Sequence, residues 1–240
     1  MTCILLTTRV RTRPPTITVS RRNPTVFVRP CWRPTSPQDA LDIIEQHSWA
    51  LLVSNGEHVP LATNLPLLID RTVTHVDPTA LVLVGHIARG NDHIRALSIP
   101  GSSALAVFQG PWSYVTASWY PNRDMPSTYY YTAVHCSGSI ELLGEQDLDR
   151  SLEDLTQRME SHYPAGWSTD EIPRSEITRR FAAIQGFRIH VSKIEAKFKL
   201  GQDEPLRDAL AVAEVLGQQQ SPQDRVLAGL IRKHNQARGV

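Results

Sequence analysis

Short apolar runs bounded by glycine and proline occupy the middle of this chain and limit what it can fold into. The run 81–84 ends at Gly85 and His86, and the run 104–108 ends at Gln109, Gly110 and Pro111. Runs of this length with such boundaries predict buried β-strands. Loops that are held by buried strands often carry binding groups. The stretch 81–121 is therefore the expected centre of the fold and of any site, although ordinary surface arginines and histidines would give the same pattern.

The flanking sequence extends the same pattern. We expect strands at 49–54, 59–63, 67–70, 128–134 and 187–194. Asn55 and Gly56 predict a hairpin turn between the first two of these strands. Strands spaced so closely predict an antiparallel sheet that closes into a barrel. The expected class is α+β, mainly β.

Helical spacing appears around these strands. Ser36 and Pro37 predict a helix start, and the helix should run to about His47. Further helices are expected at 147–160, at 167–186 with Gly186 as the terminating glycine, and at 208–216. The expected organisation is a disordered basic arm at 1–25, a barrel domain with helical additions at 26–216, and a polar, helical tail at 217–240.

Composition excludes several classes of protein. The formal charge of +1 gives no global basic excess of the kind that DNA-binding domains usually show. The apolar runs are shorter than the ~20 residues that a membrane span needs. Three scattered cysteines without CxxC spacing predict unpaired thiols in a reducing cytoplasm.

A few side chains stand out as candidates for chemistry. His86 follows a buried strand, and Arg89 in the same loop is suited to a phosphate or carboxylate. Lys197 and Lys199 should share one face of a strand and would repel each other unless an anion lay between them. Tyr129 and Tyr131 should likewise share a face that could stack on a flat cofactor. A solvated strand face and an aromatic barrel core remain the alternatives.

Several motifs taken together resemble the PaiB-type, FMN-binding negative transcriptional regulator family. The resemblance runs from about residue 26 to residue 215, and its motifs are 61–67 (LATNLPL), 85–91 (GHIARGN), 108–111 (FQGP), 118–121 (SWYP), 133–135 (AVH) and 197–202 (KFKLGQ). The resemblance implies an FMN-binding split β-barrel with peripheral helices. It also implies a homodimer with a flat cofactor at the dimer interface.

The chain departs from this family at three motifs. It has Asn64 where the family usually has His, the run 126–131 where the family has Pro-Thr-Trp-Asn-Tyr, and Gly201 and Asp203 where the family has Ser and Asn. These positions belong to the flavin-type motifs. The departures favour a related branch that the chain also resembles, the heme-dependent piperazate synthases, which close N5-hydroxyornithine by forming an N–N bond.

The resemblance to that branch implies a role for each candidate. His86 would be the metal ligand to heme iron, and the cofactor-binding set would be His86, Arg89, Asn91, Trp112 and Lys199. Tyr129 or Lys197 would be the catalytic proton donor. We therefore expect a cytoplasmic, heme-dependent enzyme that acts on a hydroxylated amino acid.

Two alternatives stay open. One is an FMN-binding PaiB-type regulator or a flavin-dependent oxidoreductase, with nucleic acid as a partner only of the regulator. The other is an accessory protein of the same fold without a cofactor.

Overall fold

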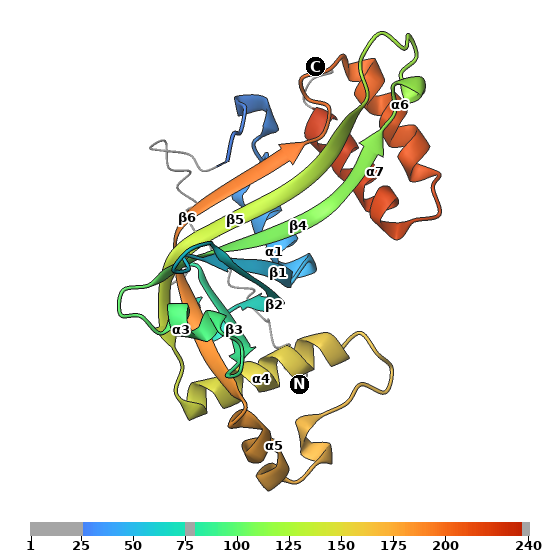
Figure 1. The fold of residues 1–240 in the computed structure, drawn as a ribbon. Helices are drawn as coiled ribbons and strands as arrows, with labels where there is room; N and C mark the ends of the chain where they lie inside the picture. Colours follow the sequence, from blue (N-terminus) through green and yellow to red (C-terminus); the bar gives the residue numbers. More distant parts are fainter. Residues whose placement is uncertain (1–25, 75–79, 237–240) are drawn as a thin grey trace, which may run out of the picture.

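Six antiparallel strands close into a barrel in the computed structural model, which describes residues 26–74 and 80–236 (Figure 1). The order around the barrel is β1-β2-β3-β6-β5-β4. The predicted α+β, mainly β split barrel is confirmed. The strands are β1 (Trp49–Ser54), β2 (Leu61–Ile69), β3 (Val82–Ala88), β4 (Ser103–Val115), β5 (Thr128–Leu142) and β6 (Ile184–Lys199).

Alternation along each strand separates a core side from an outer side. In β3, Leu83 and Ile87 belong to the main core, whereas His86 lies on the outer side and is only half-buried. In β5, Tyr130 is fully buried while its neighbours Tyr129 and Tyr131 point outward. Because side chains in a strand alternate between its two faces, the apolar inner set fills the barrel. Functional groups are left to the outer face and to the barrel ends.

Three strands are longer than the barrel needs. The upper parts of β4, β5 and β6 continue as an arm that carries α6 (Leu206–Gly217) and α7 (Pro222–Asn235) (Figure 1). A register shift between Gln109 and Trp112 in β4 marks the point where the arm leaves the barrel. Such a bulge bends and twists a strand. Leu227, Ala228 and Ile231 of α7 are fully buried in the main core, so this helix of the predicted tail packs with the barrel domain.

The remaining helices cover the barrel ends. α1 (Pro37–Gln46) begins with the capping box formed by Ser36 and Asp39 and buries Ile43 and Ile44 in the core. α4 (Glu145–Glu160) and α5 (Arg174–Phe181) lie at the opposite end, near β3 and β6 (Figure 1). The shorter elements are α2 (Arg71–Thr74), α3 (His93–Leu97), η1 (Pro30–Trp32), η2 (Ala117–Trp119) and η3 (Thr169–Glu171).

One local prediction is wrong, and another is correct except in the place where a strand begins. The helix expected to end at Gly186 stops at Phe181, and Gly186 lies in β6 opposite His86, where a side chain would contact Leu143 and Leu148. The hairpin predicted at Asn55 and Gly56 does connect β1 to β2, but β2 begins at Leu61 and not at residue 59. Pro60 has no N–H to donate to the strand ladder, which explains why pairing starts after it.

The N-terminal arm and the possibility of a membrane span were also subjects of prediction. The predicted basic arm at 1–25 lies outside the described residues. Across 26–74 and 80–236, the helices are too short or too polar to cross a membrane.

Gly110 offers a test of the barrel packing. A Cβ atom on Gly110 would lie 2.2 Å from Thr132 Oγ1 and 2.9 Å from Ile43 Cδ1. We expect Gly110→Ala to lower the free energy of unfolding by about 1–3 kcal/mol, measured by urea denaturation. Gly90→Ala is the control, since nothing lies within 4 Å of its Cβ position. Equal effects of the two substitutions would contradict this packing.

Candidate functional site

A buried histidine organises the region where β3 ends. His93 of α3 is 2% exposed, and both of its ring nitrogens lie at hydrogen-bond distance from hydroxyl groups. Nε2 is 2.8 Å from Ser54 Oγ, and Nδ1 is 2.9 Å from Thr63 Oγ1. These contacts join α3 to the ends of β1 and β2. A buried polar group without partners would be costly, so the pairing stabilises this end of the barrel.

The same network sets the orientation of Asn91. The Asn91 side-chain oxygen accepts a hydrogen bond from the His93 backbone N–H at 3.0 Å, and its amide nitrogen donates to Thr63 Oγ1 at 3.4 Å. Asn91 was a predicted cofactor-binding residue, and the structure gives it a fixed position. His93 was not singled out from the sequence. Its place two residues after Asn91, at a helix start, is the signal that could have pointed to it.

His86 lies close by on the outer side of β3. Its backbone pairs across the sheet with Gly186, and its imidazole makes no hydrogen bond or ion pair with another described residue. Burial lowers the pKa of His86, which favours the neutral imidazole with one nitrogen lone pair available. A neutral imidazole is the form that binds a metal. The group therefore has the protonation state that the predicted ligand role requires.

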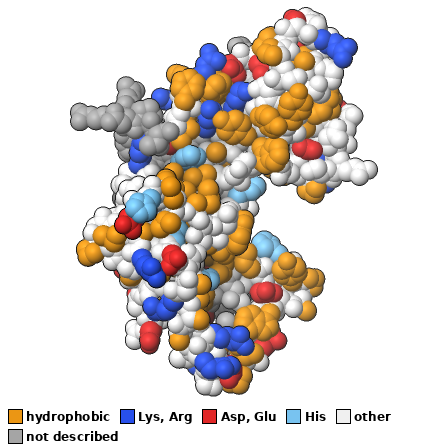
Figure 2. Space-filling model, in the orientation of Figure 1, with side chains coloured by type: hydrophobic (Ala, Val, Ile, Leu, Met, Phe, Trp, Pro, Cys, Tyr) orange, Lys and Arg blue, Asp and Glu red, His pale blue; other side chains and the backbone are white. Residues whose placement is uncertain are grey.

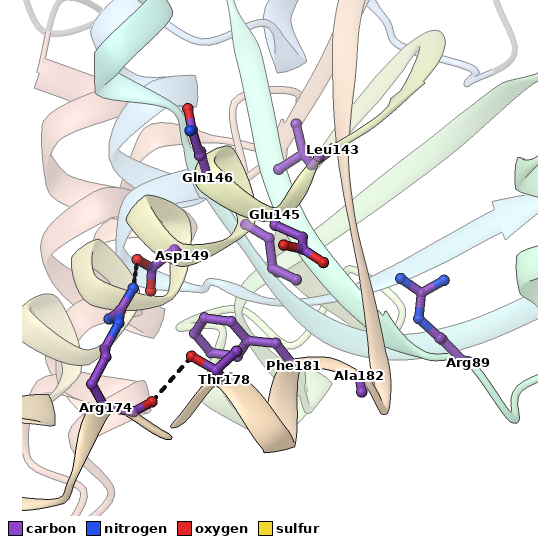
Figure 3. Close-up of a pocket in the computed structure, with 11 residues that line it drawn as sticks. Arg89, Leu143, Glu145, Gln146, Asp149, Arg174, Thr178, Phe181 and Ala182 are labelled. Atoms are coloured by element: carbon purple, nitrogen blue, oxygen red, sulfur yellow. Dashed lines mark hydrogen bonds and ion pairs between the residues drawn. The ribbon is translucent and has the colours of Figure 1, made fainter. Parts of the chain in front are cut away.

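Arg89 lines a hollow of about 570 Å³ between the end of β3, α4 and α5. Figure 3 shows Arg89 on one side of this hollow and the Arg174–Asp149 ion pair on the other, with Phe181 between them. Within the described residues, the Arg89 side chain has no carboxylate partner. Arg95, six residues later, is instead paired with Asp92. Arg89 thus leaves a guanidinium group available for an anion.

The outer surface of β1 and β4 is apolar and only half-covered. Leu51 and Val53 of β1 pair with Val107 and Leu105 of β4, and all four point outward and are half-buried. Asn64 of β2 is the other cross-strand neighbour of Leu51. A polar edge and an apolar surface therefore lie side by side, next to the end of β3.

The other predicted site residues lie on the arm. Trp112 and Tyr129 are in ring contact at 6.2 Å between their centroids. Lys199 Nζ donates to Thr128 Oγ1 and to the Tyr129 carbonyl oxygen. Lys197 Nζ lies over the rings of Phe27, Trp32 and Tyr131. The structure brings these four predicted residues together, but apart from His86, Arg89 and Asn91.

The separation of the two groups is large within one chain. Gly186, the partner of His86, and Lys199 are thirteen residues apart on β6. Thirteen residues of extended strand span roughly 43 Å. One flavin or heme molecule cannot contact both groups in a single copy. The predicted proton donors Tyr129 and Lys197 therefore do not lie beside the predicted ligand His86 in the same chain.

A family model described as "Putative FMN-binding domain" matches residues 26–193. Protease synthase and sporulation protein PAI 2 of Bacillus subtilis is 27% identical over 208 residues, which cover 86% of this chain and 96% of that protein. An uncharacterised protein of Saccharomyces cerevisiae is 30% identical over 103 residues, which cover 40% of this chain and 58% of that protein.

Two solved structures from mycobacteria share the fold. A conserved hypothetical protein of Mycobacterium tuberculosis has a TM-score of 0.52 at 12% identity, covering 75% of this chain and 94% of that one. The FAD and heme binding protein of Mycobacterium smegmatis has a TM-score of 0.50 at 17% identity, covering 70% of this chain and 73% of that one.

The His93 network predicts a pH dependence of stability. Burial lowers the pKa of His93 from its ordinary value of 6.5, so the folded state binds a proton less readily than the unfolded state. The contribution of neutral His93 is complete above pH 6.5 and is lost as the pH falls below it. We expect His93→Gln to destabilise the protein at pH 7.5 yet to lose less further stability at pH 5.5 than the unchanged protein does. Urea denaturation at both pH values measures this, with the exposed His58→Gln as control; an unchanged pH response in His93→Gln would contradict it.

Proposed function

The chain belongs to the PaiB-type family of split-barrel proteins, and from this membership we propose that it binds FMN at the end of β3. The observation that carries the proposal is that Arg89 and Asn91 lie two residues apart, directly after the end of β3. Arg89 offers a guanidinium group without a carboxylate partner among the described residues. Asn91 offers an amide that the His93 network holds in place.

A phosphate group is the anion that these two side chains suit. A guanidinium group can donate two parallel hydrogen bonds to phosphate oxygens, and charge-assisted bonds of this kind are stronger than neutral ones. The Asn91 amide nitrogen has a second N–H besides the one directed at Thr63. Both residues follow directly after the last residue of β3, so the strand fixes where this segment begins.

The surface beside this end suits a flat ring system. Leu51 and Val107 form an apolar floor on the outer side of the barrel, with Asn64 at one edge and the exposed Gln109 at another. A flavin ring has an apolar benzenoid part and a polar edge that carries hydrogen-bond donors and acceptors. FMN, when bound, supplies the capacity to accept and donate electrons. The residues named here would orient it and keep water from its apolar face.

A second copy of the chain would complete the site. The outward apolar side chains of β1 and β4 are only half-buried, so part of this surface stays in contact with water in a single copy. An exposed apolar patch of this kind often marks a protein interface. We propose a homodimer through this surface, as the family resemblance also implies. In such a dimer the flavin would lie between the floor of one copy and the surface of the other.

The name of one relative suggests what the FMN-bound protein could do. The Bacillus subtilis relative that matches over nearly its whole length is named for protease synthesis and sporulation. A regulatory output controlled by the flavin is therefore the role that we propose, with a flavin-dependent oxidoreductase as its enzymatic counterpart.

Heme is a second candidate cofactor because of His86. Its imidazole is half-buried, has a lowered pKa and lacks a described hydrogen-bond partner, so it has the character of an axial ligand. The piperazate synthase activity, with His86 as ligand and with Tyr129 or Lys197 as proton donor, stays a prediction. It would need the arm of a second copy to approach His86, since the two groups are distant in one chain.

The flavin proposal is tested by the absorption spectrum and by the flavin content of purified protein. We expect two broad flavin bands in the blue and near-ultraviolet, and a dissociation constant for FMN that Arg89→Gln raises about 10- to 100-fold through loss of a charge-assisted bond. Arg95→Gln is the matched control, because Arg95 is exposed and pairs with Asp92.

Two other spectra would contradict the flavin proposal. An intense band near the blue-violet edge that His86→Ala abolishes would instead indicate heme, and would justify an assay with N5-hydroxyornithine. Protein without any chromophore, even after incubation with FMN and heme, would point to the accessory role.

The dimer proposal has its own test. We expect Val107→Glu to convert a dimer into a monomer in sedimentation velocity, because the substitution places a charge in an apolar interface. Ile99→Glu, at an exposed apolar residue after α3, should leave the mass unchanged. The proposal would be contradicted if the protein without substitutions were a monomer, or if the Val107→Glu variant remained a dimer.

A further inference from the structure

A buried carboxylate joins the last turn of α7 to the start of α1, and the flavin proposal does not use it. Asp39 of α1 is 3% exposed, and its Oδ1 accepts a hydrogen bond from Lys233 Nζ of α7 at 2.5 Å. Its Oδ2 accepts from Thr35 Oγ1 and from the Ser36 backbone N–H, both at 2.8 Å. Both carboxylate oxygens of Asp39 are therefore already engaged.

The residue after Lys233 lies beside the same carboxylate without a hydrogen bond. The side chain of His234 is fully buried, and neither of its ring nitrogens has a hydrogen-bond partner among the described residues. Nε2 lies 3.9 Å from Asp39 Oδ2, which is too long for a hydrogen bond. The ring packs against Phe198 of β6, with 5.0 Å between the two ring centroids and a tilt of 32°.

This position accepts a neutral imidazole and disfavours a protonated one. Protonation adds a second N–H and a positive charge, and the buried ring has no acceptor among the described residues for either N–H. Phe198 offers only an uncharged ring. Within the described part of the chain, the charged groups that act on His234 are Asp39, which attracts the proton, and Lys233, which repels it. Burial has the largest effect, and the pKa of His234 is lowered from its ordinary value of 6.5.

We propose that Asp39, Lys233 and His234 form a pH-sensitive latch, which holds α7 on α1 and β6 at neutral pH and loosens the helix on acidification. The released helix can take up a proton on His234 that the docked helix disfavours. By linkage, the contribution of neutral His234 is complete above pH 6.5 and is lost as the pH falls below it. The proposal does not depend on the flavin site.

Loosening of α7 would affect the arm. Leu227, Ala228 and Ile231 of this helix are fully buried, so its release exposes apolar core to water. At its other end, Gln223 Nε2 donates to the backbone carbonyl oxygen of Trp112 at 2.8 Å, which ties the helix to β4. Acidification would therefore remove support from the strand that carries Trp112.

The latch lies apart from the end of the molecule that carries α4 and α5. α7 packs mainly on α6 and β4. Figure 2 shows a hollow between the part of the surface that carries α6 and α7 and the part that carries α4 and α5. Local opening of α7 can therefore be distinguished from unfolding of the whole barrel, for which the amides of β3 are a reference.

Hydrogen–deuterium exchange of the full chain at pH 7.5 and pH 5.5, followed by mass spectrometry, tests the latch. The rates are corrected for the intrinsic effect of pH on amide exchange. We expect peptides that cover 222–235 to lose on the order of tenfold in protection at pH 5.5, which is the most that one histidine with an unfolded pKa near 6.5 can contribute there. Peptides that cover β3 should lose less.

Three variants separate the latch from ordinary helix packing. His234→Phe keeps a ring beside Phe198 but cannot be protonated, so it should abolish the loss of protection in α7 on acidification. Lys233→Met leaves Asp39 Oδ1 free to accept from a protonated His234, so the loss should become smaller. The exposed His58→Gln is the control and should leave the loss unchanged. Each variant is compared with itself at the two pH values, so a general change in stability does not affect the comparison.

Three results would overturn the proposal. The first is equal protection of α7 at both pH values in the protein without substitutions. The second is a loss of protection that His234→Phe retains in full, which would assign the response to another group. The third is an equal loss in α7 and β3, which would mean that acid unfolds the whole barrel and does not release the helix.

Discussion

Closure of the barrel is the constraint on which the rest of the structure depends. The β3–β6 ladder joins the two ends of the sheet, and it makes every strand of the barrel paired on both edges. A closed barrel of this size has its interior filled by side chains. Groups that bind a ligand must therefore lie on the outer surface or at an end, which is where Arg89, Asn91 and the outward aromatic residues of the arm are found.

A polar contact stabilises one end of this barrel. His93 occupies a buried position between the hydroxyl groups of Ser54 and Thr63, and its backbone N–H in turn holds Asn91. A residue whose buried side chain stabilises the fold thus also fixes the position of a group proposed to bind phosphate. Support of this kind is how a rigid scaffold gives precision to a site on a loop.

The long strands divide the chemistry of the chain into two regions. The end of β3 offers a guanidinium group, an amide and a neutral imidazole beside an apolar floor. The arm offers aromatic rings and two ammonium groups, Lys197 and Lys199, that have no carboxylate partner among the described residues. Because the regions are remote in one copy, the sharpest question about this protein is whether a second copy joins them or whether each has its own ligand.

The sequence by itself determined the class of fold, most of the strands and the identity of the polar residues at their ends. Alternation predicted a strand at 187–194, and it placed Tyr129 with Tyr131 and Lys197 with Lys199 on shared faces, because the period of a strand is local. That these faces point outward was decided by the fold. Local signals failed at Gly186, where pairing with a distant strand decided the outcome. They also placed the start of β2 too early, because Pro60 has no N–H for the strand ladder.

Only the tertiary structure decided which candidates lie together. Tyr129 and Lys197 both lie on the arm, while His86 and Arg89 both lie at the end of β3. The spacing of these residues along the chain does not predict which of them are close together in space. The role of His93 also came from folding, since its partners Ser54 and Thr63 are 39 and 30 residues away in sequence. Contacts between distant segments depend on the register and closure of the whole sheet, which no local pattern encodes.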